Sequence, residues 1–136
     1  MSDCLRGRFA ILLAVGAALS SLSGCSGYGK ELKFNGGQLF YTSAVSKEQA
    51  DKLGDYLVKE KFFDGNPKTV QLNKTGSTFE VRIVVKKGIE QDQKVVDVFK
   101  VMCKELSKDV FNAAPVDIHL CDENLKTLKV VVAIGI

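Results

Sequence analysis

This sequence has little histidine and no closely spaced pair of cysteines. It has one histidine, His119, and four cysteines, none of which belongs to a CxxC pair. Asp117, His119 and Cys121 alternate along a predicted strand, so their side chains share one face and could converge on a metal ion. A structural zinc site needs four ligands, and Glu80 or Asp122 would complete it only if the strand order brought one of them near. The sequence therefore predicts no metal or other cofactor.

The chain also lacks a strong excess of charge of one sign. Its formal net charge is +3, and the lysines are interspersed with acidic residues rather than gathered in a basic run. Such a charge pattern is typical of a solvated surface and gives no ground for nucleic-acid binding. A length of 136 residues, with 46% hydrophobic and 26% charged residues, is typical of one folded domain.

The N-terminal hydrophobic run is too short to cross a bilayer as a helix. It covers residues 9–19, eleven residues, and follows Arg6 and Arg8, whereas a membrane-spanning helix needs about 20. Basic residues, a short apolar run and then small residues form the layout of a cleaved signal peptide. Residues 1–24 are therefore predicted to be a leader that is removed from the mature protein.

The leader ends in Leu22-Ser23-Gly24-Cys25, which resembles the lipobox of bacterial lipoproteins. The resemblance implies that Cys25 becomes the lipid-modified first residue of the mature chain. In Gram-negative lipoproteins, a residue such as Ser26 after that cysteine implies delivery to the outer membrane, here expected on its periplasmic side. Residues 25–30 would then form the lipid anchor and a short tether. The alternative is an ordinary cleaved leader in which Cys25 is incidental.

Beyond the tether, hydrophobic periodicity predicts three hairpins separated by two helices. Alternating apolar and polar residues indicate hairpins at residues 31–43, 68–87 and 115–134, the first closed by an Asn35-Gly36 turn. Apolar residues at helical spacing indicate helices at residues 46–63 and 92–111, the first with a capping box of Ser46 and Gln49. The buried stripe of the second helix is expected to comprise Val95, Val98, Phe99, Met102, Leu106 and Val110.

These elements predict one α+β domain over residues 31–136. The expected architecture is a two-layer sandwich whose mostly antiparallel sheet carries both helices on one face. A shift of 48 residues places Phe63 on Phe111 and Pro67 on Pro115, which indicates an internally duplicated helix–hairpin unit. A ferredoxin-like strand order is one alternative. The segment GGQLFYTSAVSKEQADKLGDYLV is similar to small uncharacterised bacterial lipoproteins, a resemblance that implies no particular activity.

The third hairpin carries the side chains that are the best candidates for catalysis or metal binding. Asp117, His119 and Cys121 are expected on an open, polar sheet face. In the alignment of the two units, His119 falls on Gln71 and Cys121 on Asn73, so plain amides take those places in the other copy. A Cys/His nucleophile needs an orienting group and an oxyanion site, and no Gly-flanked nucleophile elbow surrounds Cys121. The three residues are therefore weak site candidates.

Two further questions depend on burial. Cys103, on the second predicted helix, could form a disulfide with Cys121 in an exported domain, or remain a buried free thiol. Phe40 and Tyr41 are consecutive on one strand, so one is expected in the core and the other exposed. An exposed Phe40 would favour a partner-binding site.

Together these features favour a membrane-anchored lipoprotein that acts as a binding or structural module of the cell envelope rather than as an enzyme. Its expected partners are the membrane, through the lipid anchor, and an envelope protein. The alternative is a thiol- or metal-dependent activity centred on His119 and Cys121.

Overall fold

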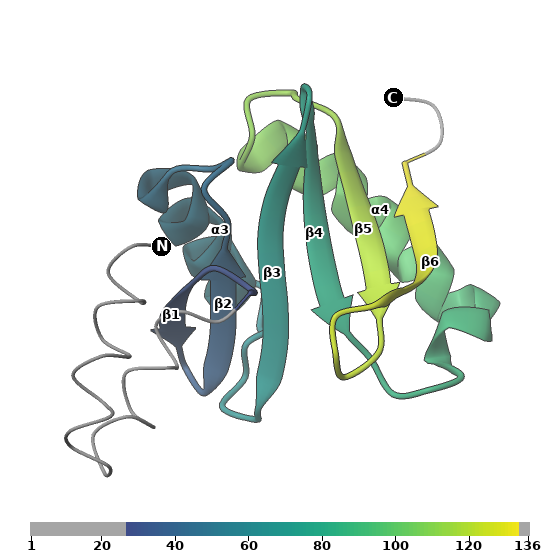
Figure 1. Cartoon of the computed structure of the whole chain (residues 1–136). Coiled ribbons are helices and arrows are strands. Elements are labelled where there is room, and N and C mark those ends of the chain that lie inside the picture. Colours follow the sequence, from purple (N-terminus) through teal and green to yellow (C-terminus); the bar gives the residue numbers. More distant parts are fainter. Residues whose placement is uncertain (1–26, 134–136) are drawn as a thin grey trace, which may run out of the picture.

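The computed structural model describes residues 27–133, which form a six-stranded sheet with two α-helices. Both helices lie behind the sheet in Figure 1, so the domain has two layers. The predicted α+β class is confirmed. In chain order the elements are β1 (Lys30–Phe34), β2 (Gly37–Tyr41), α3 (Lys47–Lys59), β3 (Lys68–Thr75), β4 (Thr78–Val84), the short 3-10 helix η2 (Ile89–Gln91), α4 (Gln93–Asp109), β5 (Val116–Cys121) and β6 (Thr127–Val132).

The six strands lie side by side in their order along the chain. Each hairpin pair is antiparallel, whereas β2–β3 and β4–β5, the two pairs joined by helices, are parallel. The sheet is therefore mixed rather than mostly antiparallel, because each helix carries the chain back to the end where the previous strand began. The ferredoxin-like order is not confirmed. In that order another strand separates the two parallel strands of a βαβ unit, and here they are adjacent.

Local sequence signals explain where the first hairpin turns and the first helix begins. Asn35 and Gly36 have φ angles of 41° and 85°, the left-handed conformation that a tight hairpin turn requires. At the start of α3, the Ser46 hydroxyl accepts a hydrogen bond from the Gln49 amide, and the Gln49 side chain accepts one from the Ser46 amide. This predicted capping box satisfies two backbone N–H groups that the helix itself leaves unpaired.

The second helix buries a different stripe from the predicted one. Val96 and Cys103 are buried alongside Phe99 and Leu106, whereas Val98 is 66% exposed. The prediction was wrong at Val98 because several neighbouring valines allow more than one apolar stripe at helical spacing, and packing against β5 and β6 selects among them. Within residues 27–133, no helix has the length and hydrophobicity needed to cross a membrane.

The core lies between the sheet and the helices. Its centre is formed by fully buried aliphatic residues on the inner strands, such as Leu72, Val81 and Ile118, which face Leu53 and Leu106 of the two helices. Each such side chain contributes roughly 1.5–3 kcal/mol through burial. Within residues 27–133, no helix covers the other face of the sheet, and this face positions the residues that the sequence singled out.

Candidate functional site

A row of aligned side chains crosses the face of the sheet opposite the helices, called here the helix-free face. Pairing between neighbouring strands places Phe40, Gln71, Arg82, His119 and Val130 in one line from β2 to β6. Because side chains alternate along a strand, the residues two positions away in each strand share this face. The predicted common face of Asp117, His119 and Cys121 is therefore confirmed.

The prediction that this face is open at His119 and Cys121 was wrong. His119 is 9% exposed and Cys121 is fully buried, while Asp117 is partly exposed. Thr127, the first residue of β6, helps to cover this part of the face, because its side chain contacts both the imidazole and the thiol. Sequence alternation reports which side of the strand a residue occupies, but not which loop covers that side.

The loop between β5 and β6 is held in place by two side chains. Asp122 Oδ1 accepts hydrogen bonds from the backbone amides of Asn124 and Lys126, at 2.9 and 3.0 Å. Arg82 Nη1 reaches from β4 and donates to the Leu125 carbonyl at 3.2 Å and to Thr127 Oγ1 at 3.1 Å. These contacts fix the loop over the strand below it, so the burial of His119 and Cys121 is built into the hairpin.

At neutral pH this environment favours the uncharged forms of both His119 and Cys121. His119 Nδ1 lies 2.9 Å from Thr127 Oγ1, and burial together with the Arg82 charge lowers the pKa of the imidazole. The Cys121 thiol donates to the His119 carbonyl at 3.4 Å, and burial raises its pKa. A nucleophilic cysteine needs a lowered pKa and access to substrate, so this geometry favours a structural role for the pair.

Glu80, on the same face, belongs to a hydrogen-bond network rather than to a metal-binding arrangement. Glu80 accepts hydrogen bonds from Asn73 Nδ2 at 3.0 Å and from Thr75 Oγ1 at 3.1 Å. Burial raises the pKa of Glu80, but these hydrogen bonds and the charges of His119 and Arg82 outweigh it and lower the pKa overall. Within residues 27–133, no three His, Cys, Asp or Glu side chains are grouped as metal ligands.

The two cysteines among the described residues are free and lie on opposite sides of the sheet. Cys103, on α4, is fully buried on the helix side and donates to the Val131 carbonyl at 3.4 Å. Burial raises the pKa of Cys103 to about 11. The disulfide between Cys103 and Cys121 that the sequence left open is therefore absent. Cys25 and the predicted leader, residues 1–24, lie outside the described residues.

Replacement of His119 by asparagine should reduce the pH dependence of stability. The folded-state pKa of His119 lies below the ordinary 6.5, so the unfolded chain binds the proton more readily. The free energy of unfolding should therefore fall as the pH drops below about 6.5, until the lowered folded-state pKa is passed. Urea unfolding at about pH 7.5 and about pH 5.5 measures this loss. An equal loss of unfolding free energy in the parent and His119→Asn proteins would contradict the assignment of this pH dependence to His119.

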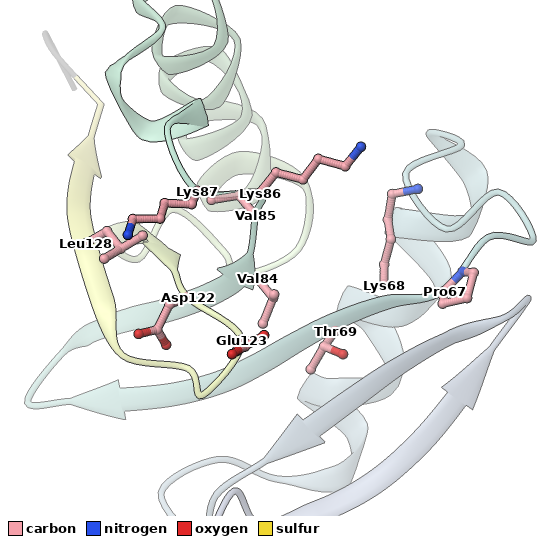
Figure 2. A pocket seen from close by; sticks show the side chains of 10 residues that line it. All are labelled: Pro67, Lys68, Thr69, Val84, Val85, Lys86, Lys87, Asp122, Glu123 and Leu128. Atoms are coloured by element: carbon pink, nitrogen blue, oxygen red, sulfur yellow. The ribbon is translucent and has the colours of Figure 1, made fainter.

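A groove at one end of the sheet, called here the sheet-end groove, brings together three segments that are distant in the chain. It has a volume of about 720 Å³ and lies between the start of β3, the end of β4 with the residues after it, and the β5–β6 hairpin (Figure 2). Lys86 and Lys87 point in different directions from the end of β4, and Asp122 and Glu123 lie on the hairpin side. The lining thus carries charges of both signs, and nothing in the local sequence indicated it.

A second groove lies between the helices and is more apolar. It has a volume of about 500 Å³, and its lining includes Tyr56 and Phe62 from α3 and the segment after it, with Val98, Val101 and Met102 from α4. Val98 and Val101 are 66% and 57% exposed. This region, called here the α3–α4 groove, was missed because the sequence assigned Val98 to the core.

Charged groups of both signs border the α3–α4 groove. Glu60 and Lys61 lie at the end of α3, and Glu105 lies across from them on α4. The Tyr56 hydroxyl donates to Glu105 Oε1 at 3.5 Å, and burial together with this carboxylate raises the pKa of Tyr56 to about 12. An apolar strip with a charged border is the common anatomy of a protein-binding surface.

Comparison with known proteins relates the whole described domain to one family. The model of the AF_1994_N family N-terminal domain matches residues 31–132, which run from β1 to the end of β6. No curated protein and no solved structure matches the chain. The family match covers both helices, all six described strands and both grooves. The chain belongs to the AF_1994_N family.

Proposed function

We propose that the protein is a lipid-anchored module of the cell envelope that acts by binding an envelope protein in the α3–α4 groove. The proposed binding site rests on the exposure of Val98 and Val101, two large apolar residues that lie one helical turn apart and line a groove. An apolar segment of a partner would remove both from water. Burying a valine side chain contributes up to about 1.5–3 kcal/mol.

The burial and hydrogen bonding of Cys121 and His119 disfavour thiol chemistry, and so they support a protein-binding function. Cys121 is enclosed and its pKa is raised, so a thiolate is disfavoured. Thr127 already occupies the hydrogen-bonding position at His119 Nδ1. The alternative of an activity centred on these two residues has no observation in its favour.

The anchor in this proposal is Cys25, on the strength of the lipobox-like Leu22-Ser23-Gly24-Cys25. Lipidation there would hold the domain at the membrane surface, and the following Ser26 favours the outer membrane. We also propose that the domain arose by duplication of a helix–hairpin unit. In support, α3 with β3–β4 and α4 with β5–β6 repeat the same succession of elements.

Site-specific photo-crosslinking in intact cells tests the binding site. A photoreactive amino acid in place of Val101 should give a discrete adduct with an envelope protein, and a further Val98→Glu substitution should remove the adduct by placing a charge in the groove. The same amino acid in place of Lys87 is the matched control, because it lies in the sheet-end groove. An adduct from position 87 and none from position 101 would move the site to the other groove and contradict the proposal.

A further inference from the structure

The first described residues, which follow the predicted anchor in the chain, are attached to the helix-free face. The Tyr28 carbonyl accepts a hydrogen bond from Gln71 Nε2 at 2.9 Å, and the Tyr28 ring packs edge-on against Phe40 with the centroids 5.5 Å apart. This packing buries Phe40, and Tyr41 is buried as well, so the expectation that one of the two is exposed was wrong. Figure 1 shows this segment crossing in front of β2, on the side of the sheet opposite the helices.

The tether between this attachment and the predicted anchor is short. Gly29 has φ +103°, and a Cβ there would lie 2.2 Å from the Tyr41 carbonyl oxygen, so the backbone is closely packed at this point. Tyr28 lies three positions after Cys25, and three steps along a fully extended chain span at most about 11 Å. A lipidated Cys25 would therefore hold the helix-free face near the membrane surface, with the helices on the far side of the sheet.

A second observation marks the same face. Val130 and Val132 of β6 are 45% and 49% exposed, and pairing with His119 and Asp117 places both side chains on the helix-free face. Single exposed apolar residues are common on protein surfaces. Here two of them share the face that the tether would hold beside the lipid, where partial burial at the interface would remove them from water.

The surface charge of the helix-free face does not explain why this face would lie against the membrane. The charged side chains that strand pairing places on the helix-free face carry both signs, so an anionic lipid surface would not attract it strongly. They are Glu31, Lys33, Glu80, Arg82 and Asp117. The short tether and the two exposed valines are the features that select an orientation.

We propose that the anchored protein lies with its helix-free face against the bilayer and its helices toward the aqueous phase. This orientation rests on the proposed lipid anchor at Cys25. It leaves the α3–α4 groove open to an envelope partner, and it assigns Val130 and Val132 to contact with lipid headgroups and the adjoining acyl chains.

Tryptophan fluorescence tests the orientation without interference, because the chain contains no tryptophan. The full-length lipoprotein carrying Val130→Trp or Val98→Trp is reconstituted in phosphatidylcholine vesicles brominated near the headgroup end of the acyl chains. Both proteins should float with the vesicles, and quenching should be several-fold stronger for Val130→Trp. Val98 is the matched control, since it is an exposed valine on the helix side.

The two proposals fail in distinguishable ways. If neither protein floats with the vesicles, the lipid anchor is wrong. If both float and quenching at position 98 equals or exceeds that at position 130, the anchor stands and the orientation is overturned. Circular dichroism checks folding first, and Val132→Trp, on the same strand and face, replaces Val130→Trp if that protein is unfolded.

Discussion

A Cys25→Ser protein should incorporate no palmitate, whereas the parent chain should be labelled when cells are grown with radiolabelled palmitate. Serine has no thiol to form the thioether that the lipobox resemblance implies, and cleavage before residue 25 would also be lost. The parent should carry two or more acyl chains at Cys25, and each buried methylene contributes about 0.8 kcal/mol to membrane binding. The expected difference is therefore close to all or none.

The leader cysteine provides the matched control for this experiment. A Cys4→Ser protein should be labelled like the parent, because residue 4 belongs to the segment that is removed. Labelling and the mass of the mature N-terminus are the decisive measurements, because an uncleaved precursor could stay on the membrane through its apolar run. Retained label in Cys25→Ser would place the acylation at another residue, and a mature parent chain with an unmodified Cys25 would show an ordinary cleaved leader instead.

Replacement of Phe63 by alanine should destabilise the domain by about 3–5 kcal/mol. The Phe63 ring is fully buried, stacks against Phe34 with centroids 6.2 Å apart, and contacts Phe62 at 5.8 Å. It links the segment after α3 to the first hairpin, since the Phe63 carbonyl also accepts from Asn35 Nδ2 at 3.0 Å. A loss of this size is a large part of the stability of a domain of this length, and urea or thermal unfolding measures it.

Gly37 makes the same contact testable from the other side. A Cβ at position 37 would lie 2.3 Å from the Phe63 ring, so Gly37→Ala alone should cost about 1–3 kcal/mol through overpacking. Combined with Phe63→Leu, it should cost less than the sum of the two single changes, because the smaller side chain leaves space for the methyl group. Gly27→Ala is the neutral control, since its added methyl group would have no neighbouring atom within 4 Å. Additive losses would contradict this packing.

Several features of the protein were determined by local sequence alone. The three hairpins and two helices occupy the predicted segments, because alternation and helical spacing are properties of neighbouring residues. The capping box at Ser46 and the turn at Asn35-Gly36 are likewise local hydrogen-bonding and backbone effects. The shared face of Asp117, His119 and Cys121 followed from alternation as well.

Only the tertiary structure decided the features that depend on contacts between distant segments. Strand pairing made the sheet mixed, and helix packing exposed Val98. The β5–β6 loop enclosed His119 and Cys121, through an arginine supplied by another strand, and thereby removed the open polar site that the sequence suggested. Both grooves arise in the same way. Periodicity tells which residues share a side of an element, but what covers that side is set by the free energy of packing segments far apart in the chain.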